Sequence, residues 1–259
     1  MWASNQFFFE FRKHLPRLRW TDYRESQAKP PLALVPHGFP EEMAYKMRDQ
    51  SFRLSLLYYS ILKQIEPSHF ESPRRFLDLG SRDFSYAVGL AVWAKEIGTD
   101  SIKVCGLELD PYQTYWNGRK RKEVGLYHAS LASSLSDQAG VELNVAYEAG
   151  DWLTWNPPSQ FDVITHLFPF LFEDLHQGFG LPMRSFSPLE YYAKSIQAAG
   201  QGMVFFHQGR KEARESKAIL SQLGGGRIVQ AFKVQENPYL ERKFPIEVLV
   251  WKKSEDFEQ

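Results

Sequence analysis

Residues 76–84 constrain the fold more than any other part of the sequence. Residues 76–79, Phe-Leu-Asp-Leu, form an apolar run without alternation, which predicts a strand buried on both faces of a parallel sheet. Gly80 follows, where glycine lets the backbone turn tightly and lets a ligand approach closely. A helical pattern then covers residues 85–96. Because ligands bind at such strand ends in open α/β sheets, we expect a ligand site here.

Strand and helix patterns alternate from Arg75 onward. Strands are predicted at residues 76–79, 102–108, 141–147, 161–166, 203–207, 228–234 and 246–251. Helices are predicted at residues 85–96, 112–124 with an extension up to 136, 170–175, 188–199 and 211–223. No helical pattern separates the last two strands, which are joined only by residues 235–243. We therefore predict a doubly wound α/β fold whose seven-stranded sheet is mostly parallel, with an antiparallel last strand.

Residues 1–70 are predicted to form a helical cap on a main domain of residues 71–259. An aromatic and basic stretch at residues 7–19 leads into a proline-rich linker at residues 30–40. Residues 41–65 then carry apolar side chains on one helical face, with Pro40 before them and Pro67 after them. We interpret the basic stretch as a solvated or packing face, with contact to an anionic partner as the alternative.

Composition excludes several classes of protein. Basic and acidic residues balance at 31 each, which argues against a general nucleic-acid coat, although local basic patches stay open. Cys105 is the only cysteine, so neither an intramolecular disulfide nor a cysteine-based zinc cluster is expected, and we predict no metal site. The sequence has neither a signal-peptide pattern nor the roughly 18 uninterrupted apolar residues of a membrane span. We expect a soluble cytoplasmic protein.

The predicted first strand lacks the G-x-G-x-x-G pattern of nicotinamide-binding proteins, since Arg82 and Phe84 stand where further glycines would be expected. The terminal hairpin also disfavours the dinucleotide-binding strand order. The order of elements in residues 75–253 instead resembles the class I S-adenosylmethionine-dependent methyltransferases. The resemblance implies a Rossmann-like sheet whose last strand is antiparallel, and S-adenosylmethionine as the cofactor.

The resemblance assigns cofactor contacts to the first two predicted strands. Residues 76–80 resemble the first motif of the family, which implies that Asp78, Gly80 and Ser81 hold the loop around the methionine part of the cofactor. Glu108 ends the second strand, where a carboxylate offers two acceptor oxygens to the two ribose hydroxyls. Asp110 is interpreted as a helix cap before Pro111 rather than as a ligand.

Further candidates follow the third, fourth and fifth predicted strands. Asp151 would bond the adenine amino group, and Trp152 would lie along the ring or belong to the core. His166 and His207 are weak catalytic candidates, because a hydrogen-bonded structural histidine is common at the end of an apolar strand. No acid–base pair can be recognised from the spacing, so the catalytic residues are not assigned.

Residues 167–188 are rich in aromatic residues and glycine, and they stand where the resembled family builds substrate lids. We therefore expect a methyltransferase that transfers a methyl group in line to a small-molecule acceptor. One alternative is a binding or scaffold protein with weak or lost cofactor binding, since the bulky Arg82 and Phe84 can obstruct the cofactor loop. Another is an RNA or DNA methyltransferase, although the basic residues 119–122 are interpreted as a solvated helix face.

Overall fold

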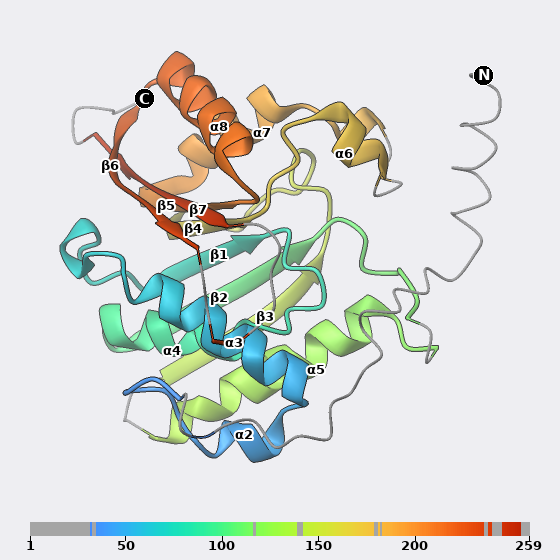
Figure 1. Cartoon of the computed structure of the whole chain (residues 1–259), viewed down its shortest axis with the longest axis vertical. Coiled ribbons are helices and arrows are strands. Elements are labelled where there is room, and N and C mark those ends of the chain that lie inside the picture. The colour runs from blue at the N-terminus through green and yellow to red at the C-terminus, as the bar shows by residue number, and fades with distance from the viewer. Residues whose placement is uncertain are drawn as a thin grey trace.

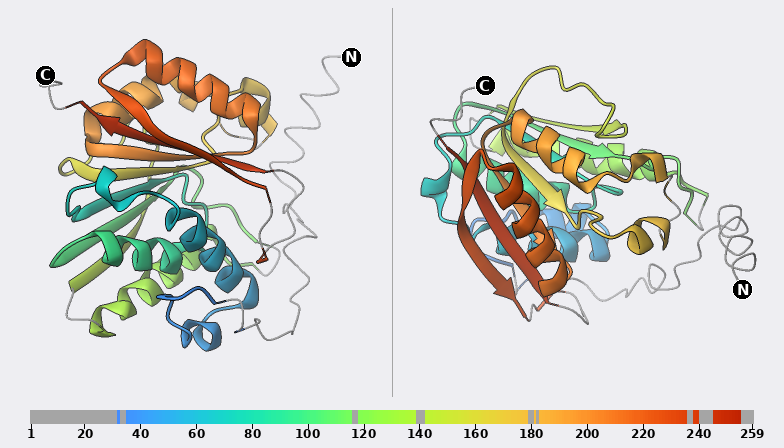
Figure 2. Two further views of the ribbon diagram at one scale, coloured as in Figure 1. Left: turned by 60° about the vertical axis from the view of Figure 1, so that its left-hand side comes forward. Right: turned by 90° about the horizontal axis from the view of Figure 1, so that it is seen from above.

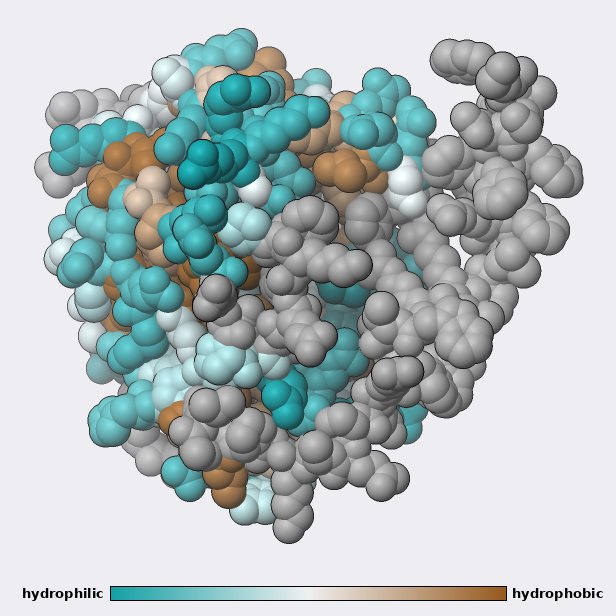
Figure 3. Space-filling model, in the orientation of Figure 1, coloured by the Kyte–Doolittle hydropathy of each residue, from teal (hydrophilic) through white to brown (hydrophobic). Residues whose placement is uncertain are grey.

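The computed structural model describes residues 32, 35–115, 118–138, 142–178, 181, 183–235, 238–239 and 245–254. These residues form one twisted sheet with helices on both faces, as Figure 1 shows. The predicted aromatic and basic stretch at residues 7–19 and the first part of the linker lie outside the described residues. On the face in Figure 3, hydrophilic side chains dominate the described surface and apolar side chains appear as patches between them.

All seven predicted strands are present, and their order is β3-β2-β1-β4-β5-β7-β6. Their bounds are β1 (Arg75–Leu79), β2 (Ser101–Glu108), β3 (Glu142–Ala149), β4 (Phe161–Leu167), β5 (Ala199–His207), β6 (Gly226–Val234) and β7 (Ile246–Lys253). Neighbours among β1 to β5 pair in parallel, whereas β7 lies between β5 and β6 and is antiparallel to both. The predicted fold class is confirmed, because the β6–β7 hairpin has no crossover helix that would make its strands parallel.

Two helical layers bury the sheet, as the views in Figure 2 show. One face carries α3 (Asp49–Leu62), α4 (Ala87–Ile97) and α5 (Arg121–Ser133), and the other carries α7 (Pro188–Ala198) and α8 (Arg210–Leu223). The shorter elements are α2 (Met43–Lys46), α6 (Glu173–Gly178), η3 (Pro67–His69), η4 (Ser134–Gln138) and η5 (Met183–Ser185). Alternate strand residues point into the two layers: on β5, Val204 and Phe206 join the core under α3 and α4, whereas Met203 and Phe205 join the core under α7 and α8.

Two helix predictions were wrong in extent. Residues 41–65, which were predicted as one helical stretch, contain two helices, because the backbone is extended at Met47 and Arg48. The helix predicted from residue 112 begins only at Arg121, after a loop closed by a bridge between Thr114 and Lys120. The Glu123 carboxylate accepts a hydrogen bond from the Lys120 backbone N–H at 3.1 Å, which caps the helix start.

The helix α3 of the predicted N-terminal cap shares its core with the main domain. Its buried residues belong to the same apolar cluster as those of α4 and α5, and Ser55 Oγ donates a hydrogen bond to the Ser85 carbonyl at 3.1 Å. The division of the chain at residue 70 stays a prediction, and α3 is integral to the packing of the described residues.

Close contact between α3 and α4 depends on Gly89, because a β-carbon there would clash with the Ser55 carbonyl. We expect Gly89→Ala to lower the free energy of unfolding by about 1–3 kcal/mol, since a backbone contact must open to admit the methyl group. Urea unfolding would measure the change. Gly178→Ala is the matched control, because a β-carbon at Gly178 meets no described atom within 4 Å. Equal stability of the two variants would contradict the inferred contact.

Candidate functional site

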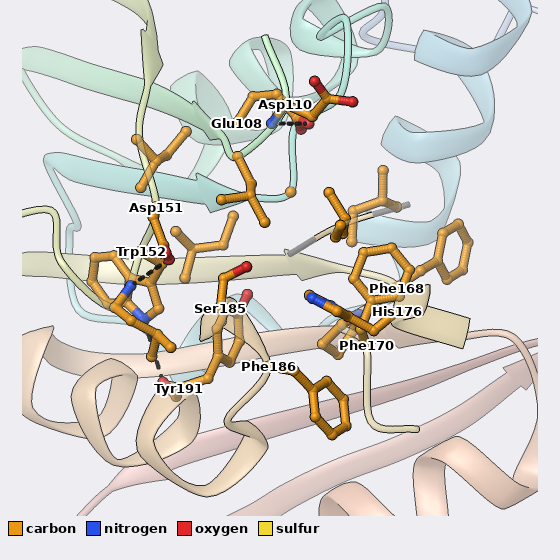
Figure 4. Close-up of a pocket in the computed structure, with 18 of the residues that line it drawn as sticks. Glu108, Asp110, Asp151, Trp152, Phe168, Phe170, His176, Ser185, Phe186 and Tyr191 are labelled. Atoms are coloured by element: carbon orange, nitrogen blue, oxygen red, sulfur yellow. Dashed lines mark hydrogen bonds between the residues drawn. The ribbon is translucent and has the colours of Figure 1, made fainter. Parts of the chain in front are cut away.

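A cavity of about 390 Å³ lies at the carboxyl ends of β1 to β4 and extends toward α6, η5 and the start of α8. Figure 4 shows its walls, with Glu108 and Asp110 in one part and Phe168, Phe170 and His176 in another. Parallel strands end at a common edge, so side chains that are distant in the sequence meet here. The predicted site residues that line the cavity are Gly80, Glu108, Asp151 and Trp152.

The loop after β1 keeps a glycine-like backbone with only one glycine. Gly80, Arg82 and Phe84 have φ values of 76°, 55° and 52°, so every second residue is left-handed. The backbone N–H groups of Gly80 and Ser81 donate to the Leu107 carbonyl, which ties the loop to β2. Ser81 is fully buried behind the loop, where its hydroxyl donates to the carbonyls of Asp78 and Leu107 at 3.0 Å. Ser81 therefore supports the loop and does not line the cavity.

The two bulky residues of this loop differ in position. Phe84 is fully buried in the core, where its ring lies edge-on to Tyr86 and tilted toward Tyr147. It does not line the cavity, so the structure gives no support to the alternative in which Phe84 obstructs the cofactor. Arg82 is exposed and does line the cavity. Its backbone N–H donates to Glu108 Oε2 at 2.7 Å, and its carbonyl accepts a hydrogen bond from the Tyr147 hydroxyl at 2.5 Å.

Asp78 lies beneath the loop rather than in the cavity wall. Its fully buried carboxylate accepts hydrogen bonds from Thr165 at 2.5 Å, Tyr86 at 2.7 Å and Tyr58 at 3.0 Å. Burial raises the pKa of this carboxyl to about 6, although the three hydroxyl donors partly lower it. Since Tyr58 belongs to α3, Asp78 links that helix, β1 and β4 directly under the loop. Contact between Asp78 and a cofactor stays a prediction.

The Glu108 carboxylate lines one part of the cavity. Its Oε1 accepts hydrogen bonds from the Arg121 guanidinium at 2.7 Å and from the Asp110 backbone N–H at 3.0 Å. Its Oε2 accepts only the Arg82 backbone N–H among the described residues. A carboxylate oxygen has two lone-pair positions, so Oε2 keeps capacity for a further donor. The interpretation of residues 119–122 as a solvated helix face was wrong for Arg121, whose side chain is only 12% exposed, because the sequence pattern placed this residue inside a longer helix instead of at the helix start.

Asp151 and Trp152 line the cavity just after β3. Asp151 Oδ1 accepts the Leu153 backbone N–H at 3.0 Å. Trp152 is nearly buried, and its indole N–H donates to Ser195 Oγ at 3.1 Å. Trp152 therefore belongs to the core under α7 and also forms part of the cavity wall, and its contact with an adenine ring stays a prediction. Lys194 Nζ lies 4.9 Å from the centre of its ring.

Neither histidine candidate reaches the cavity. The His166 ring is stacked on Phe205, with its centroid 4.3 Å away, and its Nδ1 lies 3.1 Å from the Tyr191 hydroxyl. Burial, and then the proximity of His207, hold the pKa of His166 well below its usual range. Burial, and then Lys217, lower the pKa of His207 to about 3. Both rings are buried in the core. His166 has the hydrogen-bonded surroundings that the structural alternative predicts, whereas neither ring nitrogen of His207 has a hydrogen-bond partner among the described residues.

The second part of the cavity holds residues that sequence reasoning did not single out. His176 is 2% exposed, with ring centroids 5.6 Å from Phe170 and 5.2 Å from Phe186. Glu212 lies in the first turn of α8, and its Oε2 accepts the Gln208 backbone N–H at 2.6 Å. Residues 167–188 were expected beside the substrate, and several of them form this wall. Glu212 had no such signal, because it is one charged residue among many on its helix.

The described residues contain neither a metal-binding cluster nor a helix that could span a membrane. Within them, no group of three or more His, Cys, Asp or Glu side chains is arranged to hold a metal ion. None of the described helices combines the length and apolarity that crossing a membrane requires.

Comparison with known proteins shows the fold. No protein-family model and no curated protein matches the sequence. Magnesium protoporphyrin IX methyltransferase from Synechocystis PCC 6803, solved with bound SAM, has a TM-score of 0.50 at 12% identity over 94% of this chain and 95% of that chain. A protein of Listeria monocytogenes, provisionally described as a class I S-adenosylmethionine-dependent methyltransferase, has a TM-score of 0.50 at 11% identity over 78% of this chain and 61% of that chain. The chain therefore has the fold of the class I S-adenosylmethionine-dependent methyltransferases, as its sequence predicted.

Proposed function

We propose that this protein binds S-adenosylmethionine at the ends of β1, β2 and β3 and transfers its methyl group to a small-molecule acceptor. The observation that carries the proposal is the convergence of Gly80, Glu108 and Asp151, from three adjacent strand ends, on one cavity. The likeness in fold to a methyltransferase solved with bound SAM supports it.

The residues present fit this cofactor. Gly80 brings backbone rather than side chain to the cavity, and Phe84 is packed away from it. Glu108 Oε2 has room for a ribose hydroxyl beside the Arg82 N–H. Asp151 would accept a hydrogen bond from the adenine amino group through the oxygen that does not bond Leu153, and Trp152 would contact the ring. Asp78 and Ser81 would act from behind by holding the loop.

When bound, S-adenosylmethionine supplies a methyl group already activated by its sulfonium. The protein therefore has to hold the acceptor in line and keep water out. The wall formed by Phe168, Phe170 and Phe186 suits both tasks, because aromatic side chains exclude water and limit the positions of a bound ring.

A second candidate is a binding protein of the same fold with weakened cofactor affinity. One observation favours it: the Arg121–Glu108 ion pair, at 2.7 Å and nearly buried, occupies Glu108 Oε1. A ribose hydroxyl would then share that oxygen with Arg121 or displace it. A nucleic-acid acceptor is less favoured, since the only arginine or lysine side chains among the described cavity residues are Arg82 and Arg121, both beside Glu108.

Titration calorimetry with S-adenosylmethionine and S-adenosylhomocysteine tests the proposal. We expect saturable binding of both ligands with one site per chain and micromolar dissociation constants, because three strand ends contribute to one cavity. The folded state of the sample is checked by circular dichroism. Absence of saturable heat for both ligands at millimolar concentration would refute the methyltransferase and leave the binding protein.

A further inference from the structure

The part of the cavity beyond β4, here called the aromatic half, has a composition that defines a chemical class of acceptor. Its wall is formed by aromatic and aliphatic side chains and one imidazole: Phe168, Phe170, Leu175, His176, Leu181 and Phe186. Figure 4 shows Phe168, Phe170 and His176 gathered together with Phe186 nearby, apart from Glu108 and Asp110. The whole cavity is near the lower end of the range of about 300–1,000 Å³ for ligand pockets. Since the cofactor must share it, the aromatic half suits a small, flat molecule.

Glu212 is the carboxylate of the aromatic half, because its helix α8 begins just after β5, and the Phe206 carbonyl of β5 accepts the Phe168 backbone N–H. Glu212 lines the cavity and is 9% exposed, and none of the described lysine or arginine side chains lines this half with it. Lys211, its neighbour on α8, instead lies over the Phe172 ring at 4.1 Å and does not line the cavity. A molecule with a carboxylate or phosphate would therefore meet a like charge here, whereas a cation or N–H donor would meet an acceptor.

Glu212 also has one oxygen available. Its Oε2 accepts the Gln208 backbone N–H at 2.6 Å, whereas Oε1 accepts no hydrogen bond from any described residue. Burial raises the pKa of this carboxyl, although the Gln208 bond partly lowers it. A sheltered carboxylate oxygen without a donor has more to gain from a ligand N–H than an exposed one.

Building on the proposed function, we infer that the methyl acceptor is a small arylalkylamine, whose aromatic ring lies in the aromatic half and whose alkyl-bound nitrogen faces Glu212. The amine enters as an ammonium ion and forms a charge-assisted hydrogen bond to Oε1. It passes one proton to that oxygen, which leaves a nitrogen lone pair and a neutral carboxyl group. The lone pair then bonds to the methyl carbon of S-adenosylmethionine while the bond from that carbon to sulfur breaks. The electron pair of the broken bond stays on sulfur, and the positive charge passes to the methylated nitrogen.

Three probes with one ring system test this inference: 2-naphthylmethylamine, 2-naphthalenemethanol and 2-naphthoate. Their binding to the full chain is measured by titration calorimetry with and without saturating S-adenosylhomocysteine. We expect the amine to bind at least about tenfold more tightly than the naphthoate, the order expected for one charge-assisted hydrogen bond. The alcohol should lie between them. Equal binding of amine and naphthoate, or preference for the naphthoate, would overturn the inference whether or not any variant folds.

Glu212→Gln locates the effect, because the amide oxygen can still accept the Gln208 N–H while the charge is removed. We expect the variant to bind the amine about tenfold more weakly and to bind the three probes within about threefold of one another. Glu215→Gln is the matched control, since Glu215 is exposed on the same helix and does not line the cavity. If the folded Glu212→Gln variant binds the amine as tightly as the wild type does, residues other than Glu212 determine the preference for the amine, and the inferred role of Glu212 is overturned.

The experiments distinguish failure of the acceptor inference from failure of the proposed methyltransferase function. If S-adenosylhomocysteine binds but the amine shows no preference, the acceptor inference is overturned and the methyltransferase stands. If the amine binds through Glu212 but neither cofactor form binds, the amine site is supported and the methyltransferase is overturned.

Discussion

Glu108→Ala is expected to weaken the binding of S-adenosylhomocysteine by about 100-fold, because hydrogen bonds to a charged acceptor contribute about 1.5–3 kcal/mol each. The carboxylate lies at the end of β2 with 5% exposure, so water cannot readily replace it. Titration calorimetry of the wild type and the variant measures the change. Glu108→Gln should show a smaller loss of about tenfold, since the amide keeps one acceptor oxygen.

The control for this prediction is Glu148→Ala. Glu148 is an exposed acid on β3 in register with Leu107, one strand away from Glu108, and it does not line the cavity. Its removal should leave the dissociation constant within about twofold, as exposed charges interact weakly through water. Because Glu108→Ala leaves Arg121 without its ion pair, urea unfolding must confirm that the variant is folded. An unchanged dissociation constant in a folded Glu108→Ala sample would refute the assignment of Glu108 to the ribose.

Asp78→Asn should remove a pH dependence of stability that amounts to about 3 kcal/mol between pH 4 and pH 6, at 1.36 kcal/mol per pKa unit. The pKa of the buried carboxyl is about 6 in the folded state, raised chiefly by burial from an ordinary value of 3.8. The unfolded chain therefore loses this proton at lower pH than the folded protein. The contribution of Asp78 to stability is fully present below pH 4 and falls as pH rises to 6. It is constant at higher pH.

Urea unfolding at pH 4, 5, 6 and 7 measures this effect as the difference in unfolding free energy between wild type and Asp78→Asn. The difference should change across the window, because only the wild type carries the titrating group. Asp100→Asn is the control, since Asp100 is 77% exposed and pairs with Arg74 at the surface. Its difference from wild type should vary by less than about 0.5 kcal/mol over the same range. Parallel pH profiles for wild type and Asp78→Asn would contradict the raised pKa.

The strands could be predicted from the local pattern of apolar residues. The inner strands β1, β4 and β5 contain short apolar runs because both of their faces are buried, whereas β3 alternates polar and apolar residues at the edge of the sheet. The chain between 235 and 243 lacks a helical pattern that would allow a parallel crossover. The resemblance to the class I methyltransferases assigned Gly80, Glu108, Asp151 and Trp152 to one site, and these residues meet in one cavity because parallel strands end at a common edge. Their contact with a cofactor stays a prediction.

The helix starts were less predictable, since several residues compete for the role of cap. The segment at 112–124 has a helical pattern, yet Thr114 pairs with Lys120 and Glu123 caps the helix at Lys120. This later start places Arg121 where its guanidinium reaches both Glu108 and the Asp110 carbonyl. Because the helix starts nine residues later than expected, the nearly buried ion pair between Arg121 and Glu108 was not predicted.

By itself the sequence determined the fold class and the strand ends at which the site forms. The pattern of apolar residues predicts the strands, and parallel strands end at a common edge of the sheet. Only the tertiary structure decided what each polar group does. It placed Asp78 under the loop with Tyr58 and Thr165, buried Phe84, and brought Glu212 from α8 to the same cavity as Glu108. The physical reason is that burial and hydrogen bonding at these groups come from residues far away in the chain. No local pattern encodes such contacts.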